Sequence, residues 1–152
     1  MIETIYEHFD SLVALLDLES EISINSITGD TQQSFGSTRL YVVDIVVSLV
    51  ILNEPGINCK ISESGILKKL LYFYGTFEWN NLLHFKLGVI FSTILQNHLV
   101  NSELLHSLFT QANFIPYITA LISSDDFVLK NGTARRIERG FYPYLVRFMD
   151  EI

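Results

Sequence analysis

A group of polar residues interrupts one of the apolar segments of this chain, in the stretch EWNNLLHF at residues 78–85. In a helix, Asn80, His84 and Gly88 follow one another at four-residue spacing on one face, and Asn81 is within reach of His84. Amide and imidazole groups supply hydrogen-bond donors and acceptors, and glycine leaves room for another backbone. We call these four residues the polar stripe, and they are a candidate surface for holding another protein chain.

The alternative role of the polar stripe is structural. Asn80 or Asn81 caps the start of the helix, and His84 hydrogen-bonds a neighbouring loop of the same domain. The sequence alone leaves both roles open. A second stripe at helical spacing is apolar, and we expect it in the core: Trp79, Leu83, Leu87, Ile90 and Ile94.

Asp44 poses a related question, because it lies in the most apolar segment of the chain, between Leu40 and Leu52. An unpaired carboxylate there would cost several kcal/mol. We therefore predict that Asp44 has a partner. The candidates are His84, Lys86 or an amide of the stretch at residues 78–85.

The sequence contains no recognisable arrangement for catalysis or metal binding. It lacks an HExxH motif, a glycine-rich phosphate loop and a GxSxG motif. The four histidines, His8, His84, His98 and His106, lie on different segments without spaced acidic partners. The single Cys59 permits neither an internal disulfide nor a cysteine metal cluster. We expect a protein that is not an enzyme and that needs no cofactor and no metal.

Composition and charge argue against a membrane-spanning protein and against a general nucleic-acid-binding protein. The chain is 49% hydrophobic with a mean hydropathy of +0.31, but its longest apolar run has about 13 residues where a membrane span needs about 20. A net charge of −7 argues against a general nucleic-acid binder, although Arg135, Arg136, Arg139 and Arg147 gather near the C-terminus. The first 30 residues hold seven acids and no Lys or Arg, which is unlike a secretory signal. We expect a cytosolic or nuclear protein.

Hydrophobic periodicity predicts six or seven helices joined by short connections. Polar segments at residues 19–36 and 123–133 read as loops, and the sequence NEPG at residues 53–56 ends a helix. The predicted helices are residues 5–18, 39–52, 65–75, 77–97, 102–109, 115–122 and 143–152.

This pattern predicts one all-α domain over residues 1–152. Antiparallel neighbours with nearly continuous apolar faces favour a segment of a helical-repeat solenoid of the armadillo or HEAT kind. No exact internal repeat is visible, and a plain helical bundle is the alternative.

Two stretches of the chain resemble the SAPS-domain proteins, the Sit-type phosphatase-associated regulatory subunits of type 6 serine/threonine phosphatase. STRLYVVDIVVSLV carries an arginine-leucine start and a valine-valine-acid helix, here Arg39 to Asp44. GILKKLLYFYGTFEWNNLLHFKLGVIFSTIL carries the Trp79-Asn80-Asn81 motif followed by Leu83-His84. The resemblance covers roughly Gly36 to Asp150.

A third stretch, ERGFYPYLVRF, is similar to the arginine-glycine segment near the end of the family's domain. The residues that keep their places are Arg139, Gly140, Leu145 and Arg147. Pro143 and Tyr144 stand where the family has glycine and histidine, and Asp150 stands where it usually has asparagine.

The resemblance implies a helical-repeat scaffold, corresponding to the later part of the domain. It would bind a type 6 phosphatase catalytic subunit, and further scaffold subunits, without chemistry of its own. The candidate partner-binding residues are Arg39, Asn80, Asn81 and His84, and the structural motif residues are Asp44, Trp79, Arg139, Gly140 and Arg147. The alternative is a self-associating structural or adaptor protein unrelated to phosphatase.

Overall fold

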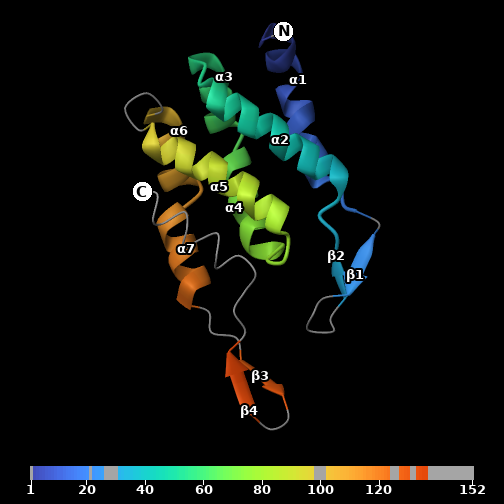
Figure 1. The fold of residues 1–152 in the computed structure, drawn as a ribbon. Helices are drawn as coiled ribbons and strands as arrows, with labels where there is room; N and C mark the ends of the chain where they lie inside the picture. The colour runs from blue at the N-terminus through green and yellow to red at the C-terminus, as the bar shows by residue number, and fades with distance from the viewer. Residues whose placement is uncertain are drawn as a thin grey trace.

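The computed structural model describes residues 2–20, 22–25, 31–97, 102–123, 127–130 and 133–136. Within these residues the chain forms seven α-helices and two short hairpins, so the predicted all-α class is confirmed for the body of the molecule (Figure 1). The helices are α1 (Ile2–Ala14), α2 (Ser37–Leu52), α3 (Pro55–Glu63), α4 (Ile66–Thr76), α5 (Asn81–Gln96), α6 (Ser102–His106) and α7 (Phe114–Ser123). A short 3₁₀-helix, η1 (Leu15–Asp17), extends α1, and a π-helical turn, η2 (Ser107–Gln111), extends α6. No helix of the described part is long and apolar enough to cross a membrane.

A hairpin occurs within residues 19–36, predicted as a loop, and a second one begins within residues 123–133, also predicted as a loop, so the prediction was wrong there. Strands β1 (Ser23–Asn25) and β2 (Thr31–Gln33) pair antiparallel in the first segment. Strands β3 (Phe127–Lys130) and β4 (Thr133–Arg136) also pair antiparallel, with β3 inside the second segment and β4 extending beyond it to Arg136. Strands of three or four residues are too short to produce a recognisable alternation in the sequence.

Helix α3 was not predicted, because Pro55 was interpreted only as the end of the preceding helix. Asn53 does end α2 in a left-handed conformation, with φ of 54°. Pro55 then occupies the first turn of α3, where its missing N–H costs nothing, and the Glu54 side chain accepts a hydrogen bond from the Ile57 N–H at 2.8 Å. The same four residues therefore end one helix and begin the next. The helix predicted at residues 143–152 lies outside the described residues.

The helices form two copies of a three-helix unit, and the first helices of the two copies correspond closely. Helices α2 and α5 each have 16 residues, and their C-terminal caps, Asn53 and Asn97, are 44 residues apart. At this offset four of the six buried positions of α2 fall on buried positions of α5. The pairs are Arg39 and Leu83, Val43 and Leu87, Val46 and Ile90, and Val50 and Ile94.

The second and third helices correspond at slightly larger offsets. Buried Ile57 and Ile61 of α3 match Leu104 and Leu108 at an offset of 47, and buried Ile66 and Leu70 of α4 match Phe114 and Ile118 at 48. The bend between them has a left-handed residue in both copies, Gly65 with φ of 69° and Asn113 with φ of 54°. Periods of about 40–47 residues are those of armadillo and HEAT repeats. The structure therefore agrees with the predicted helical-repeat segment.

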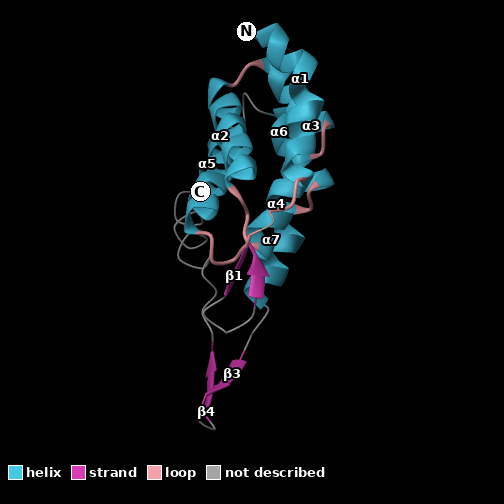
Figure 2. Cartoon of the chain, turned by 90° about the vertical axis from the view of Figure 1, so that its right-hand side faces the viewer, coloured by secondary structure: helices cyan, strands magenta, loops and turns pink. Residues whose placement is uncertain are grey.

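Equivalent helices stack on one another in two layers. Figure 2 shows α2 and α5, the first layer, on one side and α1, α3, α4 and α7 of the second layer on the other. In the second layer the Ser107 hydroxyl donates to the Ser62 carbonyl at 3.3 Å, and the Tyr117 hydroxyl donates to the Tyr72 carbonyl at 3.3 Å. Helix α1 and its extension continue this layer, since Asp17 forms an ion pair with Lys69 at 2.7 Å.

Candidate partner-binding site at the start of α5

The polar stripe begins with a helix cap. Helix α5 starts at Asn81, and the Asn80 side-chain oxygen accepts a hydrogen bond from the Leu83 N–H at 3.0 Å. The predicted core stripe is confirmed for its four residues within α5, which are fully buried: Leu83, Leu87, Ile90 and Ile94. Trp79 differs from the prediction. It lies half-buried in the turn before the helix, because α5 begins only after Asn80, whose backbone is not helical.

The cap gives a direct test. Replacing Asn80 with alanine leaves the Leu83 N–H without its acceptor, and we expect the free energy of unfolding to fall by about 1 kcal/mol in urea denaturation. Asn80→Asp should recover most of this loss, because aspartate caps equally well. Asn81→Ala, at an exposed neighbouring position, is the control and should change stability by less than about 0.5 kcal/mol. Equal losses for the two alanine variants would contradict a capping role.

His84 lies inside the protein. Its side chain is fully buried, its Nε2 atom is 2.9 Å from the Tyr74 carbonyl oxygen, and its ring centroid is 4.8 Å from that of Tyr74. Burial lowers the pKa of His84, and the hydrogen bond to the Tyr74 carbonyl acts in the opposite direction. Of the two roles left open by the sequence, this geometry favours the structural one, in which His84 holds α5 against α4.

Arg39 is also buried, with 5% of its surface exposed. Its guanidinium carbon lies 4.8 Å, 5.7 Å and 5.1 Å from the ring centroids of Phe35, Phe73 and Phe77. Its Nε donates to the Phe35 carbonyl and one terminal nitrogen donates to the Ser34 carbonyl at 3.0 Å. Burial lowers the pKa of Arg39, and the negative charge of Glu19 opposes that shift. Arg39 therefore fastens the segment before α2 to the aromatic turn after α4.

A cleft of about 200 Å³ is lined in part by Phe35 and Phe77, two of the residues around Arg39, and we call it the α5 cleft. Its lining combines amides and aromatic rings without a titratable side chain: Gln33, Ser34, Phe35, Phe77, Trp79, Asn80 and Asn81. Asn81 is exposed at the cleft, whereas the Gln33 side-chain amide already donates to the Ser20 carbonyl at 2.8 Å and to the Glu19 carboxylate at 3.4 Å. Such a lining suits a peptide segment, because amides can bond its backbone and rings can pack on its apolar side chains. The sequence indicated Asn80 and Asn81, whereas Gln33 and Phe35 come from a segment predicted as a loop.

Asp44 pairs with Lys86, one of its three predicted partners. The premise of a buried carboxylate was wrong, because 45% of the Asp44 side chain is exposed. The pair joins α2 to α5 across the first layer. Partly exposed pairs of this kind contribute little stability.

The remaining candidates do not add chemistry to the described part of the chain. Arg139, Gly140, Arg147 and His98 lie outside the described residues. Across the described ranges, no three His, Cys, Asp or Glu side chains gather closely enough to hold a metal ion. The Cys59 thiol is hydrogen-bonded to Glu63, which raises its pKa, as do the charge of Glu63 and burial. A reactive thiol requires a shift in the opposite direction.

Comparison with known proteins identifies relatives. The human serine/threonine-protein phosphatase 6 regulatory subunit 2 is 26% identical over 83 residues, which cover 55% of this chain and 9% of the human protein. The serine/threonine-protein phosphatase 6 regulatory subunit 3 of Gallus gallus is 27% identical over 89 residues, which cover 59% of this chain and 10% of the chicken protein. The chain thus spans about a tenth of the length of these relatives. No solved structure matches it.

The family match covers most of the repeat region. Residues 56–152 match the model of the SAPS family, whose description is SIT4 phosphatase-associated protein. The match begins later than the expected Gly36, so the segment from Arg39 to Asp44 lies outside it, whereas Trp79, Asn80, Asn81 and His84 lie inside. Because the matched residues make up well over half of the sequence, the chain belongs to the SAPS family of phosphatase-associated proteins.

Proposed function

We propose that this chain is a non-catalytic regulatory module that binds a type 6 serine/threonine phosphatase catalytic subunit and directs its activity. The observation that carries the proposal is the SAPS match over residues 56–152. Two relatives named as regulatory subunits of phosphatase 6 support it. The raised pKa of the Cys59 thiol and the titratable-free lining of the α5 cleft support a role in binding over one in chemistry.

The surface proposed for the phosphatase is the α5 cleft together with the exposed face that follows it. Asn81 is exposed at the cleft, and Leu82 and Phe85, at the same end of α5, are 51% and 52% exposed. Large apolar side chains left half exposed beside polar groups are typical of protein interfaces. In this proposal Asn81 contacts the partner directly, whereas Arg39, Asn80 and His84 maintain the shape of the surface.

The proposal predicts that the purified chain captures a type 6 catalytic subunit. The double variant Asn81→Ala, Phe85→Ser should weaken this binding by about tenfold or more, which corresponds to a loss of about 1.4 kcal/mol of binding free energy. Binding is measured by biolayer interferometry with the catalytic subunit immobilised. Both residues are exposed, so circular dichroism should show an unchanged fold.

A matched control is available on α7. Ile115→Ser with Thr119→Ala changes two exposed residues at the same four-residue spacing and should leave the affinity unchanged. Equal weakening by the two double variants would contradict the proposed surface. Failure of the unaltered chain to bind, while a full-length phosphatase 6 regulatory subunit binds in parallel, would contradict the proposed function.

Self-association is the second candidate function, because α2 and α5 leave several large apolar side chains exposed. They include Tyr41, Ile45, Ile51 and Leu52 on α2 and Leu82 and Phe85 on α5. Sedimentation equilibrium distinguishes the two candidates. A chain that stays monomeric at several hundred micromolar would contradict self-association.

A further inference from the structure

A pocket of about 400 Å³ lies between α4 and α7, the third helices of the two copies, which pack side by side (Figure 2). We call it the α4–α7 pocket. Its lining combines an ammonium group and an amide with phenol rings and apolar side chains, and includes Lys68, Leu71, Tyr72, Asn113, Pro116 and Tyr117. Leu71 is buried, whereas Lys68 and Asn113 are exposed. The pocket therefore offers apolar surface together with polar groups that solvent can reach.

Tyr117 fixes the distance between the two helices. Its hydroxyl donates a hydrogen bond to the Tyr72 carbonyl at 3.3 Å. The same hydroxyl lies so close to Gly75 that an added Cβ atom there would come within 2.5 Å of it. A side chain at position 75 would push Tyr117 away from α4, and glycine allows the close approach. The walls of the pocket are thus in place before any ligand binds.

The rim of the pocket distinguishes the second copy from the first. The second helices of the two copies correspond at an offset of 47 and the third helices at 48, so the second copy has one extra residue between them. The π-helical turn η2 accommodates this residue, with the Ala112 N–H donating to the Ser107 carbonyl at 3.0 Å. Asn113 then takes the left-handed position that Gly65 holds in the first copy, and it adds an amide group to the rim. Turns of the π type occur frequently at functional sites.

The charge of the pocket favours an anionic ligand. Lys68 is the one charged residue among those that line it. The elements that form the pocket, α4, η2 and α7, contain no Asp or Glu, and the second lysine of α4, Lys69, is paired with Asp17. A single ammonium group beside an amide suits a carboxylate, whereas phosphate recognition commonly relies on the bidentate fork of arginine.

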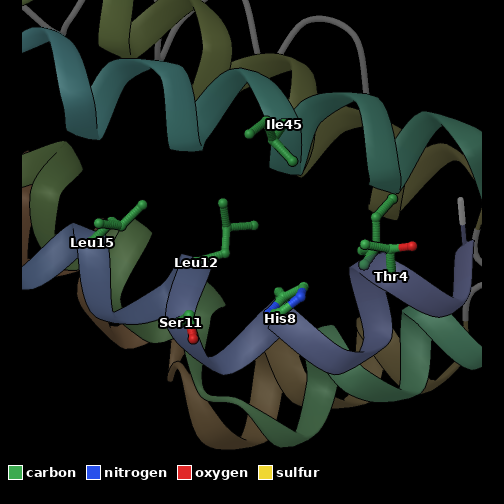
Figure 3. Close-up of a pocket in the computed structure, with 7 residues that line it drawn as sticks. Thr4, His8, Ser11, Leu12, Leu15 and Ile45 are labelled. Carbon is green, nitrogen blue, oxygen red and sulfur yellow. The ribbon is translucent and has the colours of Figure 1, made fainter.

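A larger cavity at the other end of the molecule lacks this selectivity. An apolar groove of about 460 Å³ lies between α1 and α2, where His8 and Leu12 of α1 face Ile45 of α2 (Figure 3). Its lining contains no Lys, Arg, Asp or Glu, so charge does not distinguish among the apolar segments that could cover it.

The repeat architecture leaves the α4–α7 pocket open. In a helical-repeat stack each copy packs only on its neighbours. Because α4 and α7 are already neighbours, a further copy would pack on the side of α7 that faces away from α4. A ligand of the pocket is therefore a segment that lies across two copies and is not a helix of the next copy.

We propose that the α4–α7 pocket binds an acidic peptide segment of a partner protein, in which an Asp or Glu neighbours an apolar residue. The carboxylate pairs with the Lys68 ammonium group and accepts a hydrogen bond from the Asn113 amide. The apolar side chain packs on Leu71 and on the rings of Tyr72 and Tyr117. The pocket shares no lining residue with the α5 cleft, so this binding is independent of the surface proposed for the phosphatase.

Isothermal titration calorimetry tests the proposal with a capped peptide that has Glu-Leu-Glu at its centre and glycine and serine elsewhere. The whole chain should bind it saturably, with a Kd of about 100 µM. The double variant Lys68→Gln, Tyr72→Ser should weaken binding by about tenfold or more. The matched control Lys60→Gln, Tyr41→Ser removes one cation and one exposed tyrosine outside the pocket and should leave the affinity unchanged.

Charge reversal tests the role of Lys68. A peptide with lysine in place of both glutamates should bind the Lys68→Glu variant more tightly than the Lys60→Glu variant, which has the same net charge. Equal binding of the lysine peptide to these two variants would overturn the proposal. Equal weakening of the glutamate peptide by the two double variants, or no saturation up to about 1 mM peptide, would also overturn it.

Discussion

Replacing Arg39 with alanine is expected to lower the free energy of unfolding by about 3 kcal/mol. The substitution removes two hydrogen bonds from a charged donor, to the carbonyls of Ser34 and Phe35, each of which contributes more than a neutral bond. It also leaves a void among the rings of Phe35, Phe73 and Phe77, which lose their cation–π contacts. Urea denaturation followed by circular dichroism measures the loss.

Arg39→Lys separates charge from geometry. Lysine keeps the positive charge near the three rings, but its ammonium group lacks the planar fork that addresses two carbonyls at once. We expect about half of the loss seen for alanine. Lys68→Ala, which removes an exposed cation from α4, is the control and should stay within about 0.5 kcal/mol of the unaltered chain. An Arg39→Ala variant as stable as this control would contradict the role assigned to the cage.

The burial of Arg39 was not predictable from the sequence. Arginine at the start of a helix is ordinarily solvated, and the three phenyl rings that cover it come from positions 35, 73 and 77. Only the packing of the segment before α2 against the end of α4 brings them together. The resemblance to the SAPS family indicated that Arg39 matters, but the sequence gave no reason to place it inside.

The two copies of the helical repeat have little sequence identity, although their helices correspond in the structure. Periodicity predicted α2 and α5 as helices, yet at the 44-residue offset only Ser48 and Ser92 are identical between them. Each of these serines donates its hydroxyl hydrogen bond to the carbonyl four residues earlier, at 3.0 Å and 2.7 Å. At four other positions the two helices share burial but not residue type, because packing requires a side chain of suitable size at a position and tolerates many choices. A repeat maintained by burial alone can be recognised in the structure but not by comparing the residue types of the two copies.

The residues of the polar stripe do not share one surface in the structure: Asn80 caps α5, Asn81 is exposed and His84 is buried against α4. The sequence left two roles open, a structural one and one in binding a partner. The structural role is confirmed for the Asn80 cap and for the hydrogen bond of His84 within the fold. His84 is buried because its ring contacts the carbonyl and the ring of Tyr74, which lies ten residues earlier on α4. Helical spacing defines which residues share a face, whereas tertiary packing decides what that face meets.

The burial of His84 predicts that the stability of the protein falls on acidification. The Tyr74 carbonyl can only accept, so Nε2 carries the proton of a neutral imidazole and donates it. The folded-state pKa of His84 lies below its ordinary value of about 6.5 because burial disfavours the charged ring. Above about pH 6.5 both folded and unfolded forms are neutral, and the contribution of His84 is fully present. As the pH falls further, His84 becomes protonated in the unfolded chain but stays neutral in the folded chain. The free energy of unfolding therefore declines by up to about 1.4 kcal/mol per pH unit until the folded-state pKa is reached.

His84→Gln tests this linkage, because glutamine offers an N–H to the Tyr74 carbonyl without titrating. Urea denaturation between pH 7.5 and 5 should show a shallower dependence for this variant than for the unaltered chain. The difference between the two curves should grow as the pH falls through 6.5. His106→Gln, which changes an exposed histidine on α6, is measured in parallel as the matched substitution. Parallel curves for His84→Gln and the unaltered chain would mean that the folded protein accepts the proton as readily as the unfolded one, which a ring buried against the Tyr74 carbonyl cannot do without losing its place between α4 and α5.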